Sequence, residues 1–584
     1  MDTSLLPSSR DGLVISLLVV PIFSLALYLA PQDHNKTSTS KWKSKSKKNK
    51  MASSPKYCPP PGYSLPLPTV ANVSPLPTFI SDDLVKSFPW FNTTTFAVKA
   101  SIGDTPVAEY SSRPPTNTSA SLPSLFNTKF RIASVSKLFT VLAVLLSKDK
   151  IGWDDSITTY VPGLDATAYK DVTISGLAGQ TSGLGRQGYV GDLSFIGVSP
   201  SLLGIPPTNA SLPGCDPFPG GTVCNPSEVL DMFNNPLYQP QSPESIPSYS
   251  NIAYNLLGMA LESVHPNQTF AQIMKKLVFD PADMPSAGYD TPTDPTQAIL
   301  PGPGDRWDYQ PFANHDPTGG IWTTPTELHR FAQTLRKHKF LSPAETKRWL
   351  QPRSFTSSML QFVGAPWETI RPTDLGVTPC RPIEVYTKLG GVGGYTAYLV
   401  LIPEFDITIT INVSGNDANR AITDLFPLLV KGLTKYADEV ARKQALEKYA
   451  GTYKSSEGGN SSLTLSLDNG PGLKIGEFMM NGVPVVTALA TLQKIPPQVA
   501  NANARLYPTS KDDGDESTET WRMHVPRPLD AMDGFAELNC ATWTTLDPAR
   551  FVGTPLEMMK LKVGGEKGVE IELPAWRSTL VKSG

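Results

Sequence analysis

The chain has 584 residues, a formal net charge of −2, 40% hydrophobic residues and 18% charged residues. This length predicts two folded domains, and the composition is typical of a globular protein. Without a basic excess, nucleic acid is excluded as an expected partner.

Residues 1–50 predict a membrane anchor followed by a basic linker. Residues 13–30 are almost wholly apolar, which approaches the ~20 residues that span a bilayer. A cleaved signal peptide is the alternative, but its apolar region is shorter, ~7–15 residues. Lysines interleaved with serines follow between Lys41 and Lys50. We therefore expect a single-pass membrane protein.

The signals for membrane topology conflict. The positive-inside rule places the lysine-rich side, and the rest of the chain with it, in the cytoplasm. Eight Asn-x-Ser/Thr sequons instead favour the lumen or the cell exterior, where asparagines are glycosylated. Cys215 and Cys224 bracket a Pro/Gly-rich loop, which predicts a local disulfide in an oxidising compartment. We expect the main domain on the lumenal or extracellular side.

A Pro-rich linker is expected at residues 51–80, and a mixed α/β domain at residues 81–445. Alternating and apolar runs predict two strand pairs, and helical periodicity predicts three later helices. The strand pairs are 96–101 with 107–110, and 398–402 with 407–412; the helices are near 251–264, 325–339 and 421–449. Residues 188–247 form a long irregular stretch, which is typical of a functional lid or of a disordered segment.

Residues 450–584 predict a separate, mostly β domain. Leu463, Leu465 and Leu467 alternate with polar residues, and an Asp-Asn-Gly turn follows at residues 468–470. Alternation resumes after that turn, which together makes a β-hairpin signal.

A candidate nucleophile lies in Ser134-Val135-Ser136-Lys137. Ser-x-x-Lys occurs six times, but only this copy opens a long apolar helix. Residues three apart on a helix share a face, so the Lys137 amine lies near the Ser134 hydroxyl. A helix N-terminus also leaves backbone N–H groups free to stabilise an oxyanion. The segment predicts a Ser/Lys nucleophile. A surface serine at an ordinary helix start is the alternative.

Two further segments carry groups that such a nucleophile needs. Tyr249-Ser250-Asn251 is the only Tyr-x-Asn in the chain. Its phenol can relay a proton, and its amide can hold both the lysine and a substrate. Lys388-Leu389-Gly390 runs into a glycine-rich turn, and a lysine there would lower the pKa of Lys137 toward its neutral form. A helix-start tyrosine and an exposed strand-edge lysine are the simpler interpretations.

Taken in order, these segments resemble the class C β-lactamase, D-Ala-D-Ala peptidase and esterase family of serine hydrolases. That family carries Ser-x-x-Lys, then Tyr-x-Asn, then Lys-Thr-Gly. Residues 177–184 resemble its Leu-x-x-His-Thr-Ser-Gly-Leu segment, and Thr318-Gly319-Gly320 resembles its Ala-Gly-Gly element. The likeness covers roughly residues 80–440, and residues 450–584 resemble the β domain of many fungal relatives. The implied fold is α/β (α+β), a helix-flanked antiparallel sheet with a helical subdomain.

The resemblance also implies roles for single residues. Ser134 would be the nucleophile, Lys137 and Tyr249 the acid/base pair, and Asn251, Lys388, Gly390 and Gly391 would bind the substrate, with the oxyanion hole formed by the N–H groups of Ser134 and Gly391.

Two positions depart from the family pattern. Leu389 replaces a threonine whose hydroxyl often meets a substrate carboxylate, which weakens the case for β-lactams and D-Ala-D-Ala peptides. Gln180 replaces a histidine that is not a core catalytic residue, so we expect this change to matter less.

The resemblance implies an enzyme that acylates Ser134 and passes the acyl group of a small-molecule ester or amide to water. Two alternatives stay open. The acyl group can instead pass to an alcohol or amine, as in an acyltransferase of secondary metabolism. The chain can also be a non-catalytic ligand-binding protein, although its intact Ser/Lys/Tyr set argues against this. The six histidines show no metal-ligand spacing, and we expect no cofactor.

Overall fold

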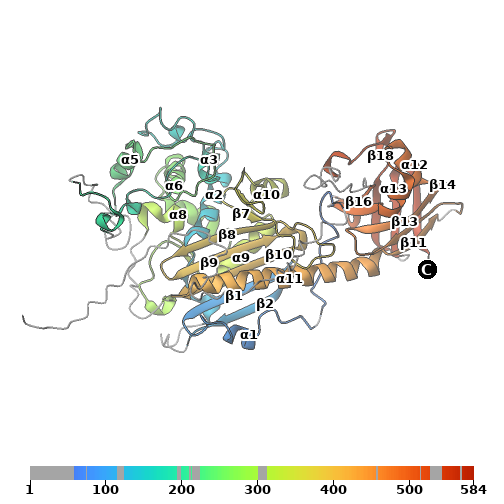
Figure 1. The fold of residues 1–584 in the computed structure, drawn as a ribbon, viewed down its shortest axis with the longest axis horizontal. Coiled ribbons are helices and arrows are strands. Elements are labelled where there is room, and N and C mark those ends of the chain that lie inside the picture. The colour runs from blue at the N-terminus through green and yellow to red at the C-terminus, as the bar shows by residue number, and fades with distance from the viewer. Residues whose placement is uncertain are drawn as a thin grey trace, which may run out of the picture.

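The computed structural model describes most of the chain after its N-terminal segment. The described residues are 58, 60–73, 75–114, 124–193, 199–208, 212, 224–299, 301, 312–455, 458–512, 515–525, 542–565 and 568–583. They form a large domain of helices around an antiparallel sheet and a C-terminal β-barrel (Figure 1). The predicted fold class is confirmed.

Eight described strands form the central sheet, in the order β2-β1-β10-β9-β8-β7-β6-β5. Both predicted strand pairs are present, and each extends beyond its predicted bounds. The strands are β1 (Thr94–Ile102), β2 (Thr105–Ser112), β5 (Ser354–Phe355), β6 (Gln361–Val363), β7 (Glu368–Ile370), β8 (Val385–Val392), β9 (Tyr395–Ile402) and β10 (Ile407–Gly415).

Helices cover both faces of this sheet. The long helix α11 (Ala418–Tyr449) packs on one face in an apolar cluster with β1 and β10. The other face carries α2 (Ser136–Leu146), α6 (Ile252–Val264) and α9 (Pro325–Arg336). Because both faces are covered, every residue of β10 is buried, and the polar residues that alternate with its apolar ones are uncharged.

The stretch 188–247 contains a helix that the sequence prediction overlooked. Helix α5 (Pro226–Asn234) begins with a capping box: the Asn225 side chain accepts from the Glu228 N–H at 3.0 Å, and the Glu228 carboxylate accepts from the Asn225 N–H at 2.7 Å. Asn-Pro-x-Glu is a helix-start signal. Cys224, just before it, is disulfide-bonded. Its predicted partner Cys215 lies outside the described residues, so their pairing stays a prediction.

The C-terminal β domain is a barrel, because β12 pairs with both β11 and β13 and so closes the sheet. Residues 462–480 form the predicted hairpin. The described helices and strands of this domain are β11 (Gly451–Ser455), β12 (Ser462–Ser466), β13 (Leu473–Met480), β14 (Val483–Pro484), α12 (Val485–Leu492), α13 (Pro497–Asn503), β15 (Arg505–Asp512), β16 (Asp515–His524), β17 (Arg550–Phe551), β18 (Thr554–Pro555), β19 (Met558–Gly565), β20 (Gly568–Leu573) and β21 (Ser578–Ser583).

The Pro-rich segment before the first helix packs against both parts of the molecule. The Ser64 N–H donates to Glu404 of the large domain at 3.2 Å, and the Ser64 hydroxyl accepts from the Gly472 N–H of the barrel at 3.1 Å. Leu65 is buried in the barrel cluster, and the Thr69 N–H donates to Gln444 of α11 at 3.0 Å. The described residues 60–73 therefore form a packed strap.

The assignment as a single-pass membrane protein is corrected. The predicted anchor at residues 13–30 lies outside the described residues. In the part of the chain that the structure describes, no helix is both long and apolar enough to cross a bilayer. The longest, α11, spans 32 residues but carries charged side chains such as Lys431, Lys435 and Glu439. One sequon offered for topology also fails as a glycan site, since Asn412 is fully buried in β10.

Candidate active site

Ser134 lies in a short 3₁₀ turn (Ala133–Val135) that leads directly into α2. Ala133 has a φ of +44°, a left-handed backbone conformation that costs a non-glycine residue about 1–3 kcal/mol and is concentrated at functional sites. Ser134 is half-buried. Ser136 is fully buried, and its hydroxyl accepts from the Ile321 N–H at 3.3 Å. Ser134 is therefore the serine of this segment that a substrate can reach.

Three oxygen atoms surround the amine of Lys137. Its Nζ lies 3.0 Å from Ser134 Oγ, 2.8 Å from Asn251 Oδ1 and 2.9 Å from the Thr318 carbonyl oxygen. The amide and carbonyl oxygens can only accept hydrogen bonds, so a neutral amine gives one N–H to each of them. Its lone pair is then left for the proton of Ser134.

The surroundings of Lys137 favour that neutral form. The side chain is fully buried, and burial is the main reason why the pKa of Lys137 lies well below its ordinary value. The positive charges of Lys388 and Arg186 lower it further, whereas Glu368 opposes the shift. The predicted influence of Lys388 on the pKa of Lys137 is therefore present in the structure.

Lys388 itself is held as a cation. Its buried Nζ lies 2.5 Å from Glu368 Oε1, and the other carboxylate oxygen accepts from the Leu389 N–H at 2.9 Å. Burial favours the neutral form of Lys388, but Glu368 and Tyr249 outweigh it and raise the pKa of Lys388. The pKa values of the two lysines are thus shifted in opposite directions, which is the arrangement expected where one acts as a base and the other as a fixed charge.

Tyr249 lies among three basic side chains, those of Lys137, Lys388 and Arg186. The centre of its ring is 5.1 Å from Lys137 Nζ, 5.2 Å from Lys388 Nζ and 4.8 Å from Arg186 Cζ. Cations within about 6 Å of a ring centre are attracted by its electrons. The predicted tyrosine is therefore beside both lysines, and Asn251, two residues later, contacts one of them directly.

Gly390 brings strand β8 against the nucleophile turn. A Cβ atom at this position would lie 2.2 Å from the Ile132 carbonyl oxygen and 2.7 Å from the Ser134 nitrogen, so only glycine fits without movement. Gly391 is the next residue of the strand and pairs with Thr396 of β9. The backbone of residues 390 and 391 therefore passes directly beside the N–H of Ser134.

The expectation that Leu389 lines the substrate site is wrong. Successive side chains of a strand point to opposite faces, so Leu389 faces away from Lys388. It lies opposite Tyr398 and packs in the cluster between the sheet and α11. The substitution of leucine for threonine therefore places no apolar wall at the active site, and it no longer argues against substrates that carry a carboxylate.

Two charged residues of this site were missed from the sequence. Glu368 is the first residue of the three-residue strand β7, which gives no alternation signal, and it reaches Lys388 only because β7 pairs with β8. Arg186 is an exposed loop residue whose carbonyl oxygen accepts from the Asn251 N–H at 2.8 Å. Thr318 belongs to α8 (Asp316–Gly319), whose Thr-Gly-Gly sequence was singled out, but its carbonyl contact with Lys137 depends on tertiary packing.

A groove of about 670 Å³ opens beside these residues. Tyr249 and Glu368 line it together with loop residues 245–248, residues 353–357 in and around β5, Gln180, Val363 and Pro366. This volume is within the ~300–1,000 Å³ typical of small-molecule sites. Arg353 in its wall is paired with Glu244 at 2.9 Å, and Phe355 exposes 80% of its surface. The groove therefore offers apolar surface next to paired charges.

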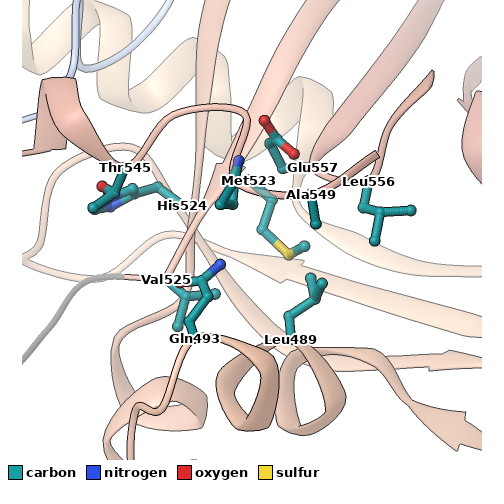
Figure 2. A pocket seen from close by; sticks show the side chains of 10 residues that line it. Leu489, Gln493, Met523, His524, Val525, Thr545, Ala549, Leu556 and Glu557 are labelled. Carbon is teal, nitrogen blue, oxygen red and sulfur yellow. The ribbon is translucent and has the colours of Figure 1, made fainter. Parts of the chain in front are cut away.

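A second void lies in the barrel, between α12, β16 and the loop before β19 (Figure 2). Its volume is about 10 Å³, roughly that of one water molecule. It is too small to bind a substrate. Among the described residues, no three His, Cys, Asp or Glu side chains gather where they could hold a metal ion.

Comparisons with known proteins place this geometry in a family. A family model described as "Beta-lactamase" matches residues 103–431, and one described as "Beta-lactamase-like-like, C-terminal domain" matches residues 441–584. Similar curated proteins include a β-lactamase-like protein of Arthroderma benhamiae, 27% identical over 78% of this chain and 81% of its own length. A probable hydrolase of Cochliobolus lunatus is 26% identical over 78% and 79% of the two chains.

A solved structure with a similar fold is the octameric penicillin-binding protein homologue from Pyrococcus abyssi. It is 17% identical, with a TM-score of 0.47, over 86% of this chain and 98% of its own. The first family model covers more than half of the 584 residues and contains Ser134, Lys137, Tyr249 and Lys388. The chain therefore belongs to the β-lactamase family of serine hydrolases.

Proposed function

We propose that the protein hydrolyses an ester or amide of a small molecule through an acyl-enzyme on Ser134. The observation that carries this proposal is the environment of the Lys137 amine. Its lowered pKa and its bonds to Asn251 and Thr318 leave a lone pair 3.0 Å from Ser134 Oγ. That is the requirement for a lysine that activates a serine.

In the proposed reaction, Lys137 takes the Ser134 proton while Oγ attacks the substrate carbonyl carbon. The carbonyl oxygen becomes an oxyanion, and we assign its stabilisation to the N–H groups of Ser134 and Gly391. The C–O or C–N bond then breaks as Tyr249 passes its proton to the leaving group, and the proton that Lys137 took moves to Tyr249, so that both groups regain their starting states. Water repeats the sequence on the acyl-enzyme, which releases the acid and restores the Ser134 hydroxyl.

The other predicted residues would hold the substrate. Asn251 fixes the lysine and can offer its amide group to the substrate, and Lys388 stays charged beside Tyr249. The groove beside Tyr249 supports a small-molecule substrate, because its size suits one and its entrance exposes apolar surface.

The test is a panel of p-nitrophenyl esters, anilides and nitrocefin, measured with the wild-type chain and with Ser134→Ala. The proposal expects hydrolysis of at least one ester or amide that is lost in Ser134→Ala. Adding a primary alcohol and measuring the products separates the two enzymatic alternatives: free acid supports hydrolysis, and a new ester as the main product contradicts it in favour of acyl transfer. Turnover that survives in Ser134→Ala would reject the proposal.

A further inference from the structure

Gln180 lies in the turn that follows α3 (Ile174–Ala178) and lines the groove together with Tyr249. It exposes only 4% of its surface and has a φ of +62°, so a non-glycine residue is held in a left-handed conformation. Such strain, about 1–3 kcal/mol, persists only where surrounding contacts impose it. The contacts of Gln180 identify what this conformation achieves.

Gln180 bonds to the residues on both sides of Tyr249. Its backbone carbonyl oxygen accepts from the Ser248 N–H at 2.8 Å, and its side-chain Oε1 accepts from the Ser250 N–H at 2.6 Å. The strained backbone turns both oxygen atoms toward the same short loop. The Pro247–Ser248 and Tyr249–Ser250 peptide groups, on either side of Tyr249, are therefore both fixed by one residue.

Neighbouring bonds also hold this loop, but they depend less on sequence. Thr181 and Gly183 accept from the N–H groups of Glu244 and Gln241 through their backbone carbonyl oxygens, which most residue types could supply. The bond to the Ser250 N–H instead needs a side-chain acceptor at position 180. Asn251 follows Ser250 directly and accepts a hydrogen bond from the Lys137 amine. The bond from Gln180 to the Ser250 N–H therefore also helps to fix this partner of Lys137.

The amide of Gln180 is also retained against a cost. Its Nε2 is buried and has no hydrogen-bond partner among the described residues. An unpartnered buried donor costs about 1–3 kcal/mol, so packing alone would favour an apolar side chain of the same length. The acceptor oxygen is then the reason for an amide at this position.

We propose that Gln180 is a positioning residue that holds Tyr249 against Lys137 and Lys388. It acts through the backbone of residues 248–250 and touches no reacting atom. This inference rests on the proposed function, since it matters for turnover only if Tyr249 takes part in proton transfer. It also reverses the expectation that replacing the family histidine with glutamine is of little consequence.

The test is a double-mutant cycle on ester hydrolysis, built from Gln180→Met and Tyr249→Phe. Methionine keeps the length of the side chain and removes the acceptor. Gln180→Met should lower kcat by about tenfold or more with little change in KM. This loss is smaller than the ~10²–10⁴-fold rate contribution of a positioned acid/base group, because the tyrosine itself is still present. In the Tyr249→Phe background it should lower kcat less than about threefold, because residues that act together are not additive.

Two further variants control the cycle. Gln180→Glu keeps an acceptor for the Ser250 N–H and should recover part of the lost kcat. Gln241→Met changes an exposed glutamine whose backbone N–H donates to Gly183 in the same region, and it should leave kcat unchanged. Thermal unfolding checks that each variant is folded; if Gln180→Met does not fold, the comparison of Gln180→Glu in the two Tyr249 backgrounds decides.

Equal losses of kcat in both Tyr249 backgrounds would overturn the role of Gln180 as a positioning residue. That outcome differs from failure of the proposed function, which would appear as turnover that does not need Ser134.

Discussion

At the scale of single residues, the site depends on the charge difference between two lysines. Lys137 and Lys388 are both buried, yet only Lys388 has a carboxylate partner at 2.5 Å. The pKa of Lys388 is raised and that of Lys137 is lowered well below its usual range. Burial alone would lower both. Glu368, with Tyr249, therefore raises the pKa of Lys388 against the effect of burial, whereas at Lys137 burial prevails.

Replacing Arg186 should move the acidic limb of the pH profile. The Arg186 charge lowers the pKa of Lys137, so Arg186→Gln removes a repulsion and raises that pKa. The base is then protonated at a higher pH, and the acidic limb of kcat/KM should move to higher pH. Arg353→Gln is the matched control, because Arg353 is paired with Glu244 and does not contribute to that shift. An unchanged limb in Arg186→Gln would contradict the account of Lys137.

At the scale of elements, strand β8 serves two faces. Lys388 and Gly390 face the helical side and the nucleophile turn, and Leu389 faces α11. The lysine and glycine of the family motif therefore lie on the face toward the active site, whereas Leu389 packs on the face toward α11. Substitutions at neighbouring positions of this strand should therefore have different effects.

Leu389→Thr should affect stability and leave selectivity unchanged. It shortens an apolar side chain packed against Tyr398 and the α11 cluster, which should cost about 1–3 kcal/mol of unfolding free energy. The ratio of kcat/KM for a carboxylate-bearing ester to that for a neutral ester should stay the same, since the side chain faces away from the site. Denaturant unfolding and the two rate constants check this. A rise in that ratio at unchanged stability would show that position 389 contacts the substrate.

Gly390→Ala should disrupt the contact between β8 and the nucleophile turn. The added methyl group would overlap the Ile132 carbonyl oxygen and the Ser134 nitrogen, so the strand or the turn must move. We expect a loss of about 1–3 kcal/mol in stability and at least a tenfold loss in kcat, because overpacking displaces backbone. Gly288→Ala is the control, since a Cβ there meets nothing within 4 Å. Similar kcat values for the two variants would refute the close approach.

Local spacing and alternation predicted the contact between Ser134 and Lys137 and both strand pairs, whereas the catalytic roles came from the family resemblance and stay proposals. Ser134 and Lys137 are three residues apart on one turn, so their contact needs no long-range information. Glu368 could not be predicted, because its partner is 20 residues away and β7 is only three residues long. The orientation of Leu389 could also have been predicted, because strand alternation places its side chain on the face of β8 that Lys388 does not occupy. Helix α5 was also available from its Asn-Pro-x-Glu start.

At the scale of the whole molecule, α11 belongs to two cores. Leu425, Leu429 and Leu433 pack in the cluster under the central sheet, whereas Ala445 and Tyr449 pack in the barrel cluster. Figure 1 shows the helix running from the large domain to the barrel. At the junction, Arg442 donates to the Thr378 carbonyl oxygen at 3.0 Å and also to that of Asp468 in the barrel.

The candidate catalytic residues and the barrel belong to different parts of the molecule. The described catalytic candidates all come from the large domain, and the barrel meets that domain through α11 and the strap at residues 60–73. We therefore interpret the barrel as a structural partner of the hydrolase domain. The claim that Ser134 is the nucleophile should accordingly be tested on the full chain.

The most direct test of Ser134 as the nucleophile is to measure the mass of the full chain after reaction with a fluorophosphonate and then to map the modified peptide. We expect one adduct, on Ser134. Ser134→Ala should give no adduct, and Ser136→Ala should still be labelled, because Ser136 is buried and bonded to the Ile321 N–H. An adduct that persists in Ser134→Ala, or that maps to another residue in the wild type, would contradict the assignment of Ser134 as the nucleophile.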